Sequence, residues 1–158
     1  MPPRRLLVLS AAVLVSAGVL SGCTAPVAMQ PAPSANDPLC AEVSVRLPPT
    51  LDGKERRQTD AQATGAWGEP AAVLLTCGIE PPGPTTLPCS TVDGVDWIIE
   101  DLGEFRFRVT TFGRTPAVEL YLDTNVDTGV SSAVVLEALA SSVGRLPIDG
   151  ACTDVPVP

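Results

Sequence analysis

The residue with the clearest chemistry is Cys23, which ends the tetrapeptide Leu20-Ser21-Gly22-Cys23. An aliphatic residue and two small residues before a cysteine form a bacterial lipobox, in which the thiol receives a diacylglycerol. Upstream, the pair Arg4-Arg5 precedes an uncharged run from Leu6 to Leu20. That run is shorter than the about 20 residues that span a bilayer, and it is typical of the apolar part of a signal peptide. Residues 1–22 are therefore predicted to be a lipoprotein signal peptide.

Cleavage before Cys23 would make an acidic chain more acidic, because it removes two of the ten basic residues and none of the 18 acidic ones. An anionic membrane repels such a body, so we expect the lipid to hold it at the outer face of the cell membrane. Export by the general secretory route is favoured, with the twin-arginine route as the alternative. An uncleaved N-terminal anchor with an incidental cysteine is the other reading.

The segment that follows has the composition of a linker. Residues Thr24–Asn36 contain three prolines, four alanines and no charged side chain. Such a segment has too little apolar surface to form a packed element. Residues 23–36 are therefore predicted to be the lipidated cysteine and a flexible tether, and residues 37–158 a single domain.

The four remaining cysteines predict two disulfides, since an exported chain folds in an oxidising environment. They are Cys40, Cys77, Cys89 and Cys152. Three pairings are possible. We favour Cys77–Cys89, which would close a Pro/Gly-rich loop, and Cys40–Cys152, which would join the ends of the domain. A zinc site is disfavoured because no CxxC pair is present, and no metal is predicted.

Two groups of arginine and tryptophan are candidates for a binding surface. The first group is Arg56 and Arg57 with Trp67. The second group is Trp97 with Arg114. Arginine and tryptophan offer large contact areas and directional donors for a carboxylate or phosphate. The alternative is that the indoles fill the core and the arginines pair with nearby acids. Exposure of the side chains decides between the two.

Carboxylates offer the main route to catalysis. Five of them cluster around one predicted strand: Asp93, Asp96, Glu100, Asp101 and Glu104. Two carboxyl groups with different pKa values can serve as acid and base, although the solvated edge of a sheet has the same composition. A calcium loop is suggested by Asp123-x-Asn125-x-Asp127, but Gly129 and Val134 depart from the pattern that calcium loops require. No catalytic residue is assigned.

The composition narrows the remaining classes of function. The chain has no histidine, which excludes Ser-His-Asp and Cys-His catalysis and imidazole-ligated zinc or haem. A net charge of −8 argues against a nucleic-acid-binding protein. Phosphate-loop and dinucleotide fingerprints are missing, and no cofactor is predicted.

Hydrophobic periodicity predicts an α+β domain: a small antiparallel sheet of three to four strands with two helices packed on it, stapled by disulfides. Asp37-Pro38 is a helix start, and Leu39, Val43 and Leu47 share one face. Strands are predicted at Ala71–Cys77, Val95–Glu100, Glu104–Thr111 and Ala117–Asp123, and a last helix at Ala133–Val143. Residues Leu51–Ala66 are expected to form a loop or an irregular turn. Glu119 is expected to pair with Arg106 or Arg108 across a hairpin.

Several short motifs occur in series over Leu39–Cys152. They are Cys40, Leu47-Pro48, Arg56-Arg57-x-Thr59, Ala66-Trp67-Gly68, Cys77-Gly78, Cys89, Gly94-Val95-Asp96-Trp97, Thr110-Thr111-Phe112-Gly113-Arg114 and Cys152. In this order they resemble the actinobacterial domain-of-unknown-function family 3515. The resemblance implies an envelope location and a compact cysteine-containing domain, and it implies no activity.

Two classes of function are compatible with these features. The favoured one is a lipid-anchored binding or accessory protein of the cell envelope, with another envelope protein or a small ligand as its partner. The alternative is a hydrolase or transferase that acts on envelope material through carboxylates. A cleft with two carboxylates would favour the enzyme, and an exposed Trp/Arg surface the binding protein.

Overall fold

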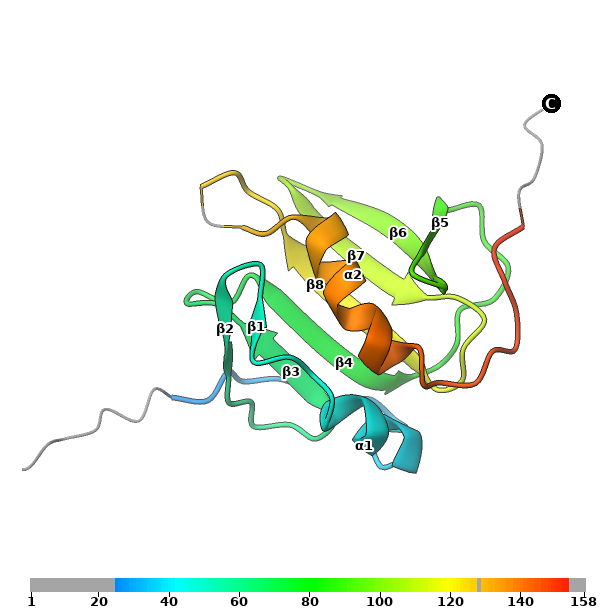
Figure 1. Ribbon diagram of the computed structural model, residues 1–158, viewed down its shortest axis with the longest axis horizontal. Helices are drawn as coiled ribbons and strands as arrows, with labels where there is room; N and C mark the ends of the chain where they lie inside the picture. Colours follow the sequence, from blue (N-terminus) through cyan, green and yellow to red (C-terminus); the bar gives the residue numbers. More distant parts are fainter. Residues whose placement is uncertain (1–24, 128, 154–158) are drawn as a thin grey trace, which may run out of the picture.

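The computed structural model of the protein describes residues 25–127 and 129–153. The chain folds into one antiparallel sheet of eight strands and two helices, with strand order β1-β2-β3-β4-β8-β7-β6-β5 (Figure 1). The elements are α1 (Pro38–Ser44), β1 (Thr50–Leu51), β2 (Lys54–Arg57), β3 (Thr64–Trp67), β4 (Val73–Ile79), β5 (Cys89–Val92), β6 (Val95–Gly103), β7 (Arg106–Thr111), β8 (Ala117–Asp123) and α2 (Ser132–Val143). Within the described ranges, no helix has the length and apolar character needed to span a membrane.

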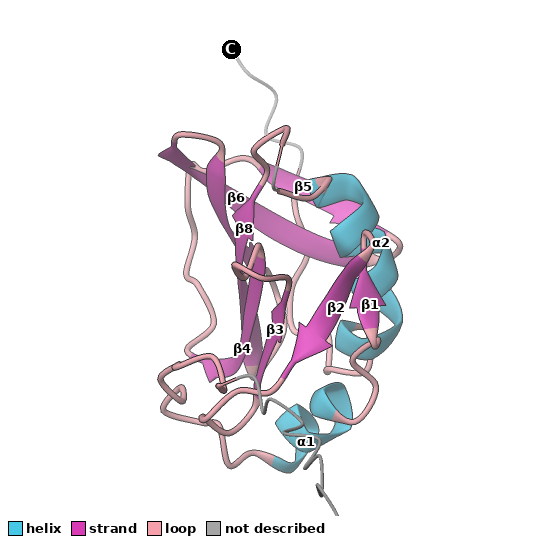
Figure 2. Cartoon of the chain, turned by 90° about the vertical axis from the view of Figure 1, so that its left-hand side faces the viewer, coloured by secondary structure: helices cyan, strands magenta, loops and turns pink. Residues whose placement is uncertain are grey.

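Helix α2 packs against the sheet and contacts strands at both of its edges. Both helices lie on the same side of the sheet (Figure 2). Helix α2 contacts β1 and β5, which are the two edge strands. A flat sheet of eight strands would hold its edges far apart, so the sheet must curl around this helix. Its strongly apolar face, with Val135, Leu139 and Val143 fully buried, fills the concave side.

The core is mainly aliphatic, with two indoles as its largest members. Leu75 on β4 and Leu120 on β8 are fully buried in the middle of the sheet. The side chains of Trp67 and Trp97 are likewise inaccessible to solvent. The predicted alternation of β8 is confirmed, since Val118, Leu120 and Leu122 are all buried.

The predicted sheet of three to four strands is wrong, although the α+β class and the disulfides are confirmed. The range Leu51–Ala66, expected to be a loop, contains β2 and parts of β1 and β3. Strand β2 reads Lys-Glu-Arg-Arg and β5 reads Cys-Ser-Thr-Val, so neither alternates between apolar and polar residues. The positions of β2 and β5 are therefore set by pairing with neighbouring strands and not by a buried apolar face of their own.

The N-terminus of α1 forms as the sequence predicts, whereas the N-cap Ser131 of α2 makes no side-chain capping hydrogen bond. The Asp37 side chain accepts a hydrogen bond from the Leu39 N–H at 2.8 Å, and Pro38 occupies the first turn. Helix α1 ends at Ser44, before the predicted Leu47, which is nevertheless buried. Prolines 48 and 49 stop the chain from continuing as a helix.

The hairpin between β6 and β7 differs from its prediction in one respect. The strand predicted at Glu104–Thr111 starts at Arg106, and Phe105 lies in the turn with 61% of its surface exposed. Both Glu104 and Phe105 have positive φ, at 54° and 62°. The expected cross-strand ion pair is confirmed, because Arg108 Nε lies 3.5 Å from Glu119 Oε2.

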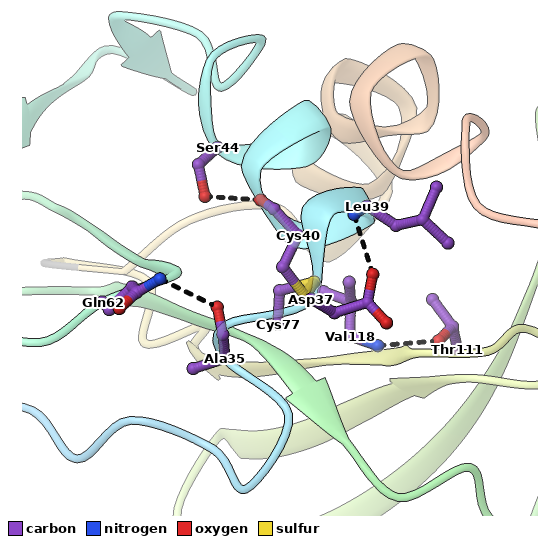
Figure 3. Close-up of a disulfide and its surroundings, with 9 residues drawn as sticks. All are labelled: Ala35, Asp37, Leu39, Cys40, Ser44, Gln62, Cys77, Thr111 and Val118. Atoms are coloured by element: carbon purple, nitrogen blue, oxygen red, sulfur yellow. Dashed lines mark hydrogen bonds between the residues drawn. A yellow bond between two sulfur atoms is a disulfide. The ribbon is translucent and has the colours of Figure 1, made fainter.

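All four predicted cysteines form disulfides, but both favoured pairings are wrong. The bonds are Cys40–Cys77 and Cys89–Cys152. The first fixes α1 to β4, and Figure 3 shows it beneath α1 with the N-terminal segment alongside. The second fixes edge strand β5 to the C-terminal segment. Pairing follows the packing of α1 on the sheet, which the spacing of cysteines does not reveal.

The segment expected to be a flexible tether lies along the domain over residues 25–36. Val27 forms a parallel bridge with Thr59, and Ala35 is only 4% exposed. The Ser34 N–H donates to the Gly78 carbonyl at 2.9 Å. Gly78 has φ +100°, and a Cβ there would lie 2.5 Å from the Ser34 carbonyl carbon. The glycine is therefore needed both for its own conformation and for the close approach of this segment.

Candidate functional site

The two tryptophans are structural. Trp67 and Trp97 have no exposed surface. The Trp67 indole N–H donates to the Pro48 carbonyl at 3.0 Å. The Trp97 indole N–H has no hydrogen-bond partner among the residues that the structure describes. Neither ring can therefore contribute to an open binding surface in this conformation.

Arg114 is also enclosed. Its side chain lies in the turn before β8 and is 3% exposed. Nη1 donates to the Leu146 carbonyl at 2.6 Å, and Nη2 donates to the Gly94 carbonyl at 2.8 Å. Burial lowers the pKa of Arg114, and the nearby Asp96 carboxylate opposes that shift. The guanidinium joins the C-terminal segment to the β5–β6 turn.

Arg56 and Arg57 are brought together with Trp67 by the pairing of β2 and β3. Arg56 is opposite Trp67 in the register, and its guanidinium carbon lies 5.9 Å from the ring centroid. Its Nη1 also donates to the Leu47 carbonyl at 3.3 Å. Partial burial lowers the pKa of Arg56. Despite these contacts the residue as a whole remains exposed.

Arg57 points to the opposite side of β2 because side chains alternate along a strand. Its Nη1 lies 3.1 Å from Glu69 Oε1, and its Nη2 donates to the Ala25 carbonyl at 3.0 Å. This arginine therefore links β2 to the turn after β3 and to the N-terminal segment.

A groove of about 650 Å³ runs along β2, and the turn after β3 and the N-terminal segment both contribute to its lining. We call it the β2 groove. It is lined by three basic residues, two acidic residues and four neutral ones: Lys54, Arg56, Arg57, Glu55, Glu69, Ala25, Gly53, Gln58 and Gly68. A second hollow of about 610 Å³, on the side of Pro49 and Thr50, shares Arg56 and Arg57 with it. The arginines of β2 are thus accessible from two concave surfaces.

Lys54 is the lining residue that the sequence reading missed. It is the single lysine of the chain and lies two residues before Arg56 on β2. The available signal was the density of positive charge, since three of the ten basic residues fall within four positions of a chain with net charge −8. Because the segment was expected to be a loop, that density was not assigned to a surface.

Three of the five clustered carboxylates, Asp96, Glu100 and Asp101, form contacts within the fold. Asp96 accepts from the Thr91 hydroxyl at 2.6 Å and from the Cys152 N–H at 2.7 Å. Glu100 lies 2.7 Å from Arg108 Nη1, and Asp101 accepts from the Gly103 N–H at 2.7 Å. These contacts hold the β5–β6–β7 region and the C-terminal segment together.

The suggested calcium loop is a series of turns. Asp123 accepts from the Asn125 N–H at 2.9 Å, and Asn125 accepts from the Asp127 N–H at 3.0 Å. Such bonds are the ordinary chemistry of Asx turns. Within residues 25–127 and 129–153, no group of three or more Cys, Asp or Glu side chains is arranged to hold a metal ion.

Comparison with curated proteins gives no match, and comparison with solved structures gives none. A family model does match. It is described as Protein of unknown function (DUF3515), and it covers residues 6–148. The match reaches further towards the N-terminus than the motifs discussed above, and it ends shortly before Cys152. It confirms the resemblance found in the sequence. The chain belongs to the DUF3515 family.

Proposed function

We propose that this chain is a lipid-anchored binding or accessory protein on the outer face of the cell membrane. The observation that carries the proposal is the lipobox Leu20-Ser21-Gly22-Cys23 directly after an apolar run of signal-peptide length. Two acyl chains on Cys23 would be enough for stable attachment, whereas a single chain would bind only marginally.

Binding is favoured over catalysis by the state of the charged residues. Carboxylates such as Asp96 and Glu100, which an envelope hydrolase would need, are engaged in hydrogen bonds and ion pairs of the fold. The arginines of β2 line an accessible groove instead. The binding surface we propose is therefore the β2 groove, with an anionic ligand.

The anchor is tested by expressing the full chain with labelled fatty acid in a bacterial host that processes lipoproteins. We expect label in the wild type, and we expect Cys23→Ser to lose it and to be released or to remain as a precursor. Ser21→Ala is the matched control, because alanine is equally small and should leave processing intact. Label in Cys23→Ser would refute the anchor.

A further inference from the structure

The position of the N-terminal segment bears on what the β2 groove meets. Ala25 lines the groove, and its carbonyl accepts from Arg57 Nη2 at 3.0 Å. Val27 then pairs with Thr59, and the Met29 N–H donates to Asp60 Oδ1 at 2.8 Å. The chain is thus fixed to the domain from Ala25 onward instead of leaving it as a long tether.

Cys23 precedes Ala25 by two residues, which can span at most about 7 Å. The Cα atom of Cys23 would therefore lie within about 7 Å of that of Ala25, which lines the β2 groove. The position of the groove at the membrane depends on the lipidation proposed above. Lipidation at Cys23 would place the groove, and not an arbitrary face of the domain, next to the headgroups of the membrane in which the lipid inserts.

The basic residues of the groove suit such a neighbour. Lys54 and Arg56 lie on one face of β2 and Arg57 on the other, and all three line the groove with an ammonium or a guanidinium group. Glu55 and Glu69 also line the groove, and Glu69 is already engaged by Arg57. The three cations exceed the two carboxylates here, whereas the chain as a whole carries a net charge of −8.

We infer that the β2 groove binds the phosphate-bearing headgroup of an anionic phospholipid in the membrane that holds Cys23. The lipid anchor supplies the attachment, and the groove determines which face of the domain rests on the bilayer. The acidic remainder of the surface is repelled by the same headgroups, so the two effects favour one orientation.

Lys54 provides a specific probe, because it is the single lysine in the chain. The protein is expressed from the full chain, purified from the host and reconstituted into vesicles of phosphatidylcholine alone, or with added phosphatidylglycerol. The labelling rate of Lys54 by a membrane-impermeant amine reagent is then followed by mass spectrometry of the Lys54 peptide. We expect slower labelling in the phosphatidylglycerol vesicles, and we expect high salt to remove the difference.

Two substitutions in the groove should change the protection of Lys54 in opposite directions, and a third outside the groove is the control. Arg56→Gln should weaken the protection of Lys54 about fivefold, the factor expected for one basic side chain near an anionic surface. Glu55→Gln should strengthen it by a similar factor, a gain that a misfolded protein would not produce. Arg145→Gln is the control, because it makes the same change of charge at an exposed site outside the groove.

Equal labelling of Lys54 in both kinds of vesicle would overturn the inference. Protection by inorganic phosphate in phosphatidylcholine vesicles, as strong as that by phosphatidylglycerol, would also overturn it, since the ligand would then be soluble. Fatty-acid analysis of the same samples separates the two proposals. Lipid on Cys23 with equal labelling refutes the groove alone, and an unlipidated Cys23 with phosphatidylglycerol-dependent protection refutes the anchor alone.

Discussion

Arg114 donates from Nη1 to the carbonyl oxygen of Leu146 at 2.6 Å, across 32 positions of the sequence. The bond joins the turn before β8 to the segment that follows α2. The neighbouring Gly113 is in such close contact with Gly150 that a Cβ on Gly113 would overlap the Gly150 backbone. The C-terminal segment is therefore seated against this turn by both a buried charge and a steric fit.

Arg114→Ala is expected to lower the free energy of unfolding by about 3 kcal/mol, because it leaves two carbonyls without their charged donor. Urea denaturation with the disulfides intact measures the change. Arg145→Ala removes an exposed arginine nearby and should change stability by less than about 0.5 kcal/mol. Similar effects of the two substitutions would show that Arg114 does not hold the segment.

The two buried tryptophans allow a matched comparison. Trp67→Phe breaks the hydrogen bond from the indole to Pro48, whereas Trp97→Phe removes an N–H that has no partner within the described part of the chain. Both substitutions remove a similar volume from a fully buried site. We expect Trp67→Phe to be the more destabilising by about 1–2 kcal/mol in chemical denaturation. The reverse order would contradict this assignment.

Gly78→Ala should detach the N-terminal segment. The substitution forces a side chain into a left-handed conformation and against the Ser34 backbone, so a loss of about 2 kcal/mol or more is expected. Limited proteolysis should then cleave within residues 25–36 faster than in the wild type. Gly83→Ala is the control, because nothing lies within 4 Å of its Cβ position. Unchanged proteolysis of Gly78→Ala would argue against the docking of this segment.

The β6–β7 turn contains a removable strain. Phe105 is exposed and has φ 62°, a conformation that glycine adopts readily and phenylalanine does not. Phe105→Gly should therefore raise the midpoint of urea denaturation, with a gain of about 0.5–1 kcal/mol. Phe105→Ala keeps a Cβ and should give no such gain. If both variants are destabilised equally, the exposed ring contributes to stability in another way.

Disulfide mapping without reduction should recover Cys40 linked to Cys77, and Cys89 linked to Cys152. Trypsin leaves Cys77 and Cys89 on one peptide, because no Lys or Arg lies between them. Pepsin is the better protease, and its acid conditions suppress disulfide exchange. Replacing either pair by alanine should lower stability by about 4 kcal/mol. A Cys77–Cys89 peptide would contradict the fold described above.

The sequence revealed those parts of the fold whose signals are local. Asp37 caps α1 through its own side chain, and the alternation of β8 reports a buried face directly. Strand β2 has no such signal, because its partners Trp67 and Ala66 on β3 define its place. The β2 groove was missed for the same reason: it exists only where β2, the Glu69 turn and Ala25 meet.

The contacts of α2 with both edge strands also govern the order in which the fold can be completed. Edge strands β1 and β5 lack their packing against α2, and β5 lacks its disulfide to Cys152, until the chain has been made that far. Open edges pair readily with other chains. A chain that folds from its N-terminus onward is therefore most prone to aggregate when it is nearly complete. Truncations after β8 should be far less soluble than the whole protein.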